Sequence, residues 1–552
     1  MKSRISTNWA PCTISAKPCT RILRDSVPLS PSLSSGERAS PQWTSATPSD
    51  GSSTLPGSSV SGPQSTVAGS PIDGLDPELS EKDRPTHQPL NNELLLPLDY
   101  QSGNEESSLI ATGLGSIPYL GTDCMPWPNS LTLTQTEVSA LVYYEQILMR
   151  HVSTKDPAWS TTALLLRVSA HNAMVMHLLL STTMREMSLA HGRDSSLLRS
   201  AERHYQAGMK LLVEETTKDT EPDHIAVMSA FLFLYFFKAQ QRAQDSHATQ
   251  LLSKAIKNHV EMFGLHLLVA GTKFSSSPVL TGKRPRCRQT LPPREQSLLA
   301  RLMTWMYYAD VQNSFQGCGG NLARMLDSHP GLTNDIYDQS RPILELNWGS
   351  GYPYDQALDD VENSIVLELF HRVFRIMQQI NEASRNLTRL EEHETSAIDE
   401  QLSRLRIKYS PIFNLAARST GPRNRLLCNI DTTVAHFYTL RLYQFVLVSP
   451  PCMQPPPAVQ EGLSLLFSLA QRSLTHGVAD QRYRLAWPLF FAGIVTDDAI
   501  YQDWVLGHMP PCSIRDTLNN IISLQRSLGV KRLPLDNIRQ ILRPCPAPIQ
   551  DC

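Results

Sequence analysis

Residues 194–212 read DSSLLRSAERHYQAGMKLL and have the pattern of an amphipathic helix. The side chains of its apolar stripe recur at steps of three and four residues: Leu198, Ala201, Tyr205, Met209 and Leu212. Residues with these spacings lie on one face of an α-helix, so this face is expected to be buried. Asp194 precedes the pattern and can accept hydrogen bonds from the free amides of the first turn. The stretch therefore predicts a helix that packs on a core by one side.

The same period continues on both sides of this stretch. Order is expected to begin near Thr134, because Thr134 and Glu137 have the spacing of a capping box and apolar residues follow at helical steps. Asp156 and Pro157 predict another helix start. Further helices are expected over 158–190, 225–241, 248–269, 294–315, 361–390, 395–408, 424–448, 458–474, 483–500, 513–528 and 536–542. No strand-like alternation and no fixed-period repeat accompanies them, so the sequence predicts an all-α fold of stacked helices.

The N-terminal region has a different composition. Between residues 26 and 71, 31 of 46 residues are Ser, Pro, Gly or Thr. The segment therefore has too few apolar side chains for their burial to offset the entropy of ordering the chain. Residues 71–107 carry nine carboxylates against Lys82 and Arg84. This acidic segment is either a solvated linker or, through its leucines, a docking segment for a co-regulator. We expect residues 1–107 to be disordered and residues 108–552 to form the helical domain, in one unit or in two lobes over 130–270 and 294–545.

Composition excludes several classes of function. Hydrophobic residues make up 41% of the chain and charged residues 18%, and the net charge of -2 provides no general attraction to nucleic acid. The longest apolar run, residues 225–237, is shorter than the roughly 20 residues that span a bilayer, so no membrane partner is expected. No secretory signal follows the basic N-terminus.

No motif in the sequence indicates an enzyme. The ten cysteines are scattered singly, without metal-site or disulfide spacing. Phosphate-loop, dinucleotide-binding, zinc-protease and serine-hydrolase patterns are absent from the sequence. An all-α cyclase would need aspartate-rich metal-binding motifs, and the pairs at 359–360 and 497–498 lack the surrounding acidic residues. We therefore expect no catalytic residue, no metal ligand and no cofactor.

Two stretches of the chain resemble one known family. Residues 486–494 read AWPLFFAGI, and 305–320 contain a tryptophan, an Asp-Val pair and three glycines. The first stretch resembles an element of the second type of fungal-specific transcription factor domain in which Trp-Pro-Leu-Phe is followed by Ala-Gly-Ile. The second resembles the helix of the same domain that contains a tryptophan and an Asp-Val pair. This domain is the regulatory domain of many zinc-cluster (Zn2Cys6) regulators. The residues that carry this resemblance are Trp305, Asp310, Trp487, Pro488, Phe490 and Gly493. The large apolar members among them are also what any helical core requires, so their joint order, not any single residue, supports the family.

The resemblance implies a nuclear regulator of transcription that controls metabolic or biosynthetic-cluster genes through its helical domain. It implies transcriptional co-regulators as partners, allows a homodimer, and suggests DNA only by family analogy. The alternative is a helical scaffold or interaction protein that derives from the family and does not bind DNA.

The zinc cluster of the family needs six thiolates within a few tens of residues. Only Cys12 and Cys19 precede Cys124 here, and two thiols cannot close a tetrahedral zinc site. Zinc would be a cofactor only if a missing N-terminal cluster exists. We expect either that the DNA-binding module has been lost or that a first exon is missing, and we expect no sequence-specific DNA binding by a zinc cluster in the chain as given.

A basic cluster provides a candidate nuclear localisation signal. Its residues are Lys283, Arg284, Arg286 and Arg288, in the segment 271–293, which is rich in Ser, Pro and basic residues and is expected to be an exposed loop. Acidic grooves of an import receptor recognise such a run. A solvated basic loop without a receptor is the alternative.

Overall fold

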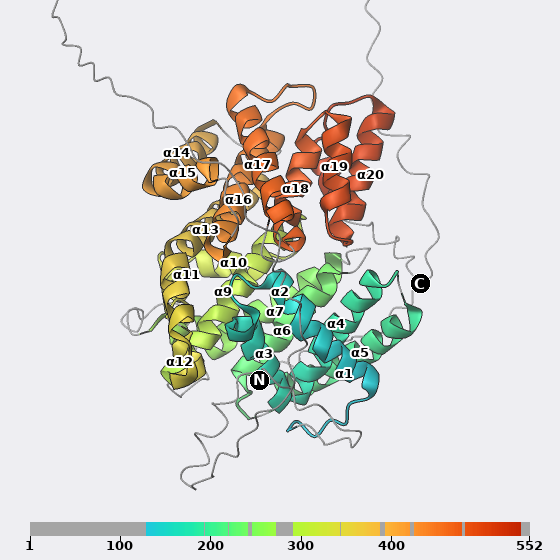
Figure 1. Ribbon diagram of the computed structural model, residues 1–552, viewed down its shortest axis with the longest axis vertical. Helices are drawn as coiled ribbons and strands as arrows, with labels where there is room; N and C mark the ends of the chain where they lie inside the picture. The colour runs from blue at the N-terminus through green and yellow to red at the C-terminus, as the bar shows by residue number, and fades with distance from the viewer. Residues whose placement is uncertain are drawn as a thin grey trace, which may run out of the picture. The chain divides into compact units, whose positions relative to one another are not determined.

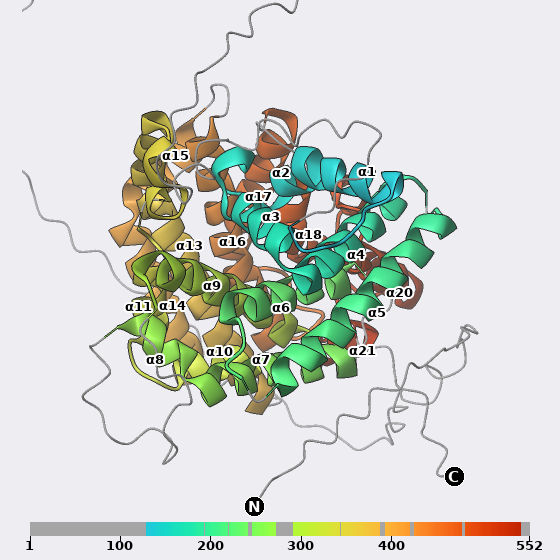
Figure 2. The same cartoon turned by 90° about the horizontal axis from the view of Figure 1, so that it is seen from below.

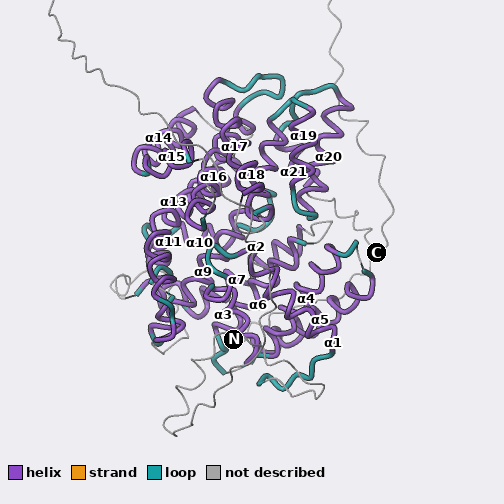
Figure 3. Tube along the Cα trace, viewed as in Figure 1, coloured by secondary structure: helices purple, strands orange, loops and turns teal. Residues whose placement is uncertain are grey.

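The computed structural model describes residues 128–542, except 193, 219, 241–245, 272–290, 343, 387–391, 420–423 and 477–480. Over these residues the chain forms helices and no strand (Figure 3), which confirms the predicted all-α class. The region expected to be disordered, residues 1–107, lies outside the described residues.

The first group of helices covers residues 135–270. It comprises α1 (Gln135–Tyr143), a π-helical turn (Tyr144–Leu148), α2 (Met149–Val152), α3 (Thr161–His171), α4 (Ala173–Ala190), α5 (Ser195–Thr217), α6 (His224–Ala239), α7 (Ser246–Phe263) and α8 (Leu265–Ala270). The capping box of Thr134 and Glu137 is confirmed at the start of α1. Asp194 caps α5 by accepting from the amide of Ser196, as predicted.

Among the described residues, the middle group contains four shorter helices and the long helix α13. It comprises α9 (Pro293–Phe315), α10 (Asn321–Asp327), α11 (Leu332–Gln339), α12 (Glu345–Trp348) and α13 (Tyr354–Asn386). The three short helices lie in the segment where no helical period was predicted. Each is too short to show a period, and Gly320 and Gly331, at the N-caps of α10 and α11, have positive φ angles.

The last group completes the domain. It comprises α14 (Glu392–Lys408), α15 (Ser410–Arg418), α16 (Arg425–Val448), α17 (Pro457–His476), α18 (Arg482–Val495), α19 (Ala499–His508), α20 (Ser513–Leu528) and α21 (Leu535–Leu542). The predicted helix at 513–528 has the observed bounds. The α15 helix was not predicted.

Three predicted helices are each divided in two. The segment 158–190 breaks at Asn172, whose backbone is extended. The Asn172 side chain caps α4 by accepting a hydrogen bond from the amide of Val175. The segment 248–269 breaks at Gly264, which has a φ of 65°. The segment 483–500 breaks before Asp498, which caps α19. Apolar residues continue across these breaks, so periodicity alone does not reveal them.

Packing connects the early helices to the late ones through α9, α13 and α16. Helix α9 contacts α6 and α13, α13 contacts α16, and α16 contacts α17 and α18. In Figure 1 the helices α3–α6 lie in the lower half of the view and α16–α20 in the upper half, and Figure 2 shows the same arrangement from below. The middle helices therefore join segments that are distant in sequence.

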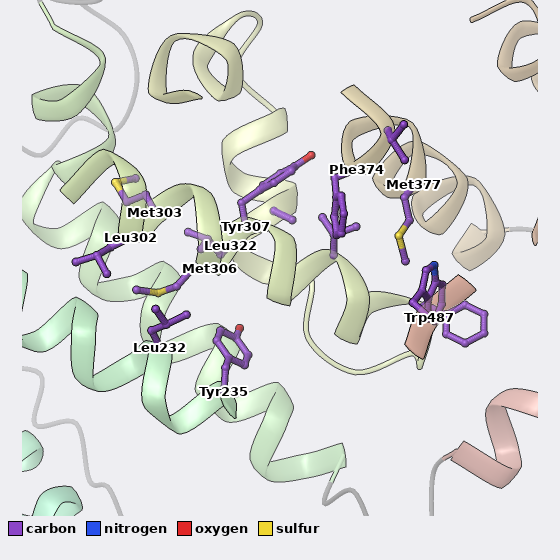
Figure 4. Close-up of a cluster of buried hydrophobic side chains, with 14 of the residues drawn as sticks. Leu232, Tyr235, Leu302, Met303, Met306, Tyr307, Leu322, Phe374, Met377 and Trp487 are labelled. Carbon is purple, nitrogen blue, oxygen red and sulfur yellow. The ribbon is translucent and has the colours of Figure 1, made fainter. Parts of the chain in front are cut away.

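Most of the buried apolar side chains belong to one cluster that draws on all three groups. Figure 4 shows part of it, with side chains from α6, α9, α10, α13 and α18: Leu232, Tyr235, Leu302, Met303, Met306, Tyr307, Leu322, Phe374, Met377 and Trp487. The boundary expected at residue 108 lies outside the described residues, and the division into lobes over 130–270 and 294–545 stays a prediction. No helix in the described part of the chain is long and apolar enough to cross a bilayer.

Candidate functional site

The residues that carry the resemblance lie on two helices, and the end of one of them packs against the other. Trp305 and Asp310 are on α9, and the remaining four are on α18: Trp487, Pro488, Phe490 and Gly493. Phe315, the last residue of α9, joins the two helices, because its ring lies 4.5 Å from that of Trp487 in an edge-to-face arrangement. We call this neighbourhood the helix junction.

Asp310 is a fully buried carboxylate that organises the junction. One of its oxygens, Oδ1, accepts hydrogen bonds from the amide of Gly320 and from the Tyr235 hydroxyl, each at 2.9 Å. The other, Oδ2, accepts from the amide of Ala323 at 2.9 Å. Both amides belong to the first turn of α10, which has no capping side chain of its own. Asp310 therefore caps α10 from a neighbouring helix.

The turn before α10 requires glycine. Gly320 has a φ of +73°, and a Cβ atom added there would lie 2.6 Å from the guanidinium of Arg385 and 2.8 Å from the Ser314 hydroxyl. A side chain is excluded both by the backbone conformation and by this contact. The Asp-Val pair and the following glycines thus form one structural unit, in which glycine lets the backbone come close enough to bond with Asp310.

Tyr235 completes the hydrogen bonding of Asp310. Its hydroxyl is fully buried, and burial together with the negative charge of Asp310 raises its pKa well above the ordinary value. The tyrosine therefore stays protonated and donates to the carboxylate, which joins α6 to α9.

Aromatic packing forms the second half of the junction. Trp487 is 5% exposed and lies against Phe315, Phe491 and Tyr443, with ring centroids 4.5, 4.8 and 6.5 Å away. Phe490 is fully buried beside them. Edge-to-face pairs of this kind contribute beyond the area that they bury.

Pro488 and Gly493 shape α18 itself. Pro488 stands inside the helix, where it cannot donate a hydrogen bond to the carbonyl four residues before it. A Cβ atom at Gly493 would lie 2.9 Å from the Leu518 side chain and 3.4 Å from that of Val505. Gly493 thus permits the close packing of α18 against α19 and α20.

Arg539 of α21 closes the junction. This arginine is 8% exposed and donates to the carbonyl of Phe315 at 3.0 Å, to the Ser384 hydroxyl at 2.6 Å and to the Tyr443 hydroxyl at 3.2 Å. Phe315 ends α9, and Ser384 lies in the last turn of α13. A cation at helix C-termini interacts favourably with their partial negative charge and satisfies their free carbonyls. Sequence analysis did not identify this residue, because its partners are at least 96 positions away.

A second buried carboxyl lies between early and late helices. Glu186 of α4 is 2% exposed and accepts a hydrogen bond from the Tyr483 hydroxyl of α18. Burial raises its pKa to about 7, opposed by a hydrogen bond with Gln240 of α6. The negative charge of Glu186 in turn contributes to the raised pKa of Tyr143 and Cys512. The group is neutral at mildly acidic pH and charged at alkaline pH.

The exposed side of α13 is the candidate surface for a partner. Its first three turns present large apolar side chains to solvent: Tyr354, Leu358, Val361 and Ile365. The prediction placed the start of this helix at residue 361 and so missed half of the pattern. The spacing of four, three and four residues was the signal that could have revealed it.

The described residues contain no group of three or more histidine, cysteine, aspartate or glutamate side chains arranged as a metal site. Cys12 and Cys19, and the basic cluster Lys283, Arg284, Arg286 and Arg288, lie outside the described residues. The predictions made for them stay predictions.

Comparison with known proteins gives one match. The family model described as the fungal specific transcription factor domain matches residues 141–533. This range contains both the α9 and the α18 part of the helix junction. No curated protein and no solved structure matches the chain.

Proposed function

The chain belongs to the fungal specific transcription factor domain family, and from that membership we propose that it is a nuclear regulator of transcription that acts through its helical domain. The proposal extends to control of metabolic or biosynthetic-cluster genes. It includes no catalytic step, since the family is one of regulators rather than enzymes.

The observation that carries this proposal is the extent of the match. It covers residues 141–533, and so nearly all of the described helices. The junction supports it, because Asp310 bonds to the glycine turn and Phe315, at the end of the same helix, packs against Trp487. A domain built in this way offers helix surfaces, and we propose that co-regulators bind there.

A non-DNA-binding scaffold is the second candidate. It is favoured by the cysteines, because Cys12 and Cys19 are too few to hold a zinc ion in a closed site. Such a scaffold would have kept the helical domain but lost the role in transcription, so it would not occupy promoters, whereas the regulator would.

Chromatin immunoprecipitation of the tagged full chain, with nuclear fractionation of the same cells, tests the proposal. We expect nuclear protein enriched at a defined set of promoters over non-promoter DNA. A cytoplasmic protein, or a nuclear one without promoter enrichment, would contradict it and support the scaffold alone.

We propose that the basic cluster drives nuclear entry. Replacing Lys283, Arg284, Arg286 and Arg288 by alanine should lower the nuclear fraction of the tagged chain, because a receptor binds the run through charge. Alanine at four exposed basic residues of described helices is the matched control: Arg199, Lys210, Lys254 and Arg404. An unchanged nuclear fraction in the quadruple variant would remove this assignment.

A further inference from the structure

An apolar stripe lies on the exposed face of α13. Tyr354 is 83% exposed, and Leu358, Val361 and Ile365 are 48%, 58% and 50% exposed. We call these four residues the α13 stripe. Steps of four, three and four residues place them on one side of the helix over about 17 Å, at 1.5 Å per residue. They have the arrangement of the seam of a coiled coil.

The stripe is separate from the core that the same helix helps to form. Other sides of α13 bury Asn363 and Val366, each at most 1% exposed. The helix is therefore apolar both where it faces the core and along the stripe, and about half or more of each stripe side chain stays exposed to solvent. An exposed contiguous apolar face of this kind marks a site of protein interaction.

The two edges of the stripe differ in charge. Asp355 and Glu362 lie seven residues apart on one edge and are exposed, while Ala357 and Ser364 occupy the other edge without charge. The two remaining carboxylates of this segment face the domain: Asp359 pairs with Arg425, and Asp360 lies 2.5 Å from Lys155. The stripe thus combines an apolar seam with one acidic edge.

We propose that the α13 stripe docks an amphipathic helix of another protein, one with apolar residues at heptad spacing and lysine or arginine beside Asp355 and Glu362. Apolar contact supplies the burial, and the acidic edge selects the charge and orientation of the incoming helix. The inference rests on the proposed function only in assigning this partner to the co-regulators of transcription.

Charge disfavours a second copy of this chain as the occupant. Two stripes packed antiparallel would place the acidic edges, each with Asp355 and Glu362, against one another. Packed parallel, each acidic edge would meet the uncharged edge of the other copy. Neither arrangement forms an ion pair across the seam, whereas a basic helix forms one at each of the two carboxylates.

Designed peptides test the docking site directly. The probes are two labelled helical peptides of three heptads, alike except that lysine or glutamate flanks a leucine seam, and fluorescence anisotropy with the purified full chain gives each Kd. The lysine peptide should bind about tenfold more tightly than the glutamate peptide, with the difference decreasing as salt rises. The double substitution Leu358→Ser and Val361→Ser should weaken binding of the lysine peptide about tenfold or more.

Matched variants separate a specific site from general stickiness. Ile500→Ser removes a side chain that is 78% exposed on α19 and should leave the Kd unchanged. Asp355→Lys combined with Glu362→Lys should reverse the preference, so that the glutamate peptide binds better. Circular dichroism and thermal unfolding confirm that each variant is folded.

Three results would overturn the inference. They are equal affinity for both peptides, a loss of affinity for the lysine peptide in Ile500→Ser as large as in the double serine variant, or an unchanged peptide preference in the charge-reversed chain. A dimer in sedimentation that Leu358→Ser and Val361→Ser abolish would instead assign the stripe to a second copy. These measurements need no promoter or nucleus, so their failure leaves the proposed function to be judged by chromatin immunoprecipitation.

Discussion

Asp310 is the residue whose removal should be most damaging. Asp310→Ala leaves three buried donors without an acceptor: the amides of Gly320 and Ala323 and the hydroxyl of Tyr235. We expect the free energy of unfolding to fall by about 3–5 kcal/mol. Asp310→Asn keeps one acceptor oxygen and should cost less. Urea unfolding measures both, with Asp503→Ala, 67% exposed on α19, as the control. A loss in Asp310→Ala no greater than in the control would show that the cap does not stabilise α10.

Glu186 predicts a dependence of stability on pH. Its folded pKa is raised to about 7 from 4.5, so the folded state binds the proton more tightly than the unfolded state. This contribution to stability is complete below pH 4.5 and is lost as pH rises to 7. Glu186→Gln removes the titration and should raise the free energy of unfolding by about 1–3 kcal/mol at pH 8, with little effect at pH 4.5.

Chemical unfolding of both proteins at the two pH values checks this prediction. Glu214→Gln, at a half-exposed position on α5, is the control and should show no such difference. A Glu186→Gln variant that is destabilised equally at both pH values would contradict the prediction, because it would mean that the protonation of Glu186 does not alter stability and that an amide cannot replace the carboxyl beside Tyr483 and Gln240.

At the scale of residues, local motifs could be predicted from the sequence but their distant partners could not. Asp310 and Trp487 were identified because their motifs are local, but their partners are not: Tyr235 and Asp310 are 75 positions apart. The burial of Glu186 could not be predicted, since nothing in the sequence near it differs from a surface glutamate. The depth of a carboxyl depends on helices that arrive later in the chain.

At the scale of elements, helices were predictable where a cap and a period coincide. Helix α5, which Asp194 caps, is of this kind. Breaks at Asn172 and Gly264 were missed because apolar residues continue across them, and α10 was missed because Asp310 supplies its cap from another helix. Tertiary contacts, rather than local preference, decide such boundaries.

The hydrogen bonds of Arg539 are expected to stabilise the packing of α21 against the ends of α9 and α13. Arg539→Met keeps a long apolar stem but loses the bonds to Phe315, Ser384 and Tyr443. We expect a loss of about 2–4 kcal/mol, since two helix C-termini then have carbonyls without a donor. Hydrogen exchange should accelerate in α21 and in the last turns of α9 and α13. Arg404→Met, 71% exposed on α14, is the control. Unchanged exchange in those turns would mean that Arg539 does not hold them.

At the scale of the whole molecule, the helical domain is the functional unit that the family match defines. The early helices carry Tyr235 and Glu186, the late helices carry Trp487, Tyr483 and Arg539, and the junction joins them through α9. The α13 stripe lies on the exposed side of a helix whose other side belongs to the same core. A partner bound there would therefore contact an element that the junction holds in place.

The small number of N-terminal cysteines predicts how the chain behaves toward DNA. The chain should bind no particular duplex through a zinc cluster, because Cys12 and Cys19 cannot hold two metal ions. Zinc analysis and a binding assay near physiological salt check it. Two zinc ions per chain, with nanomolar affinity for one duplex that a chelator abolishes, would contradict the prediction.

We propose that this chain regulates transcription through its helical domain. Tethering tests it most directly: the full chain is fused to an unrelated DNA-binding module, and transcription from a reporter with the operator of that module is measured. We predict a several-fold change in transcription relative to the module alone, and a loss of that change in the Asp310→Ala fusion, whose junction is broken. Transcription equal to that of the module alone, from a fusion shown to be folded and nuclear, would contradict the claim.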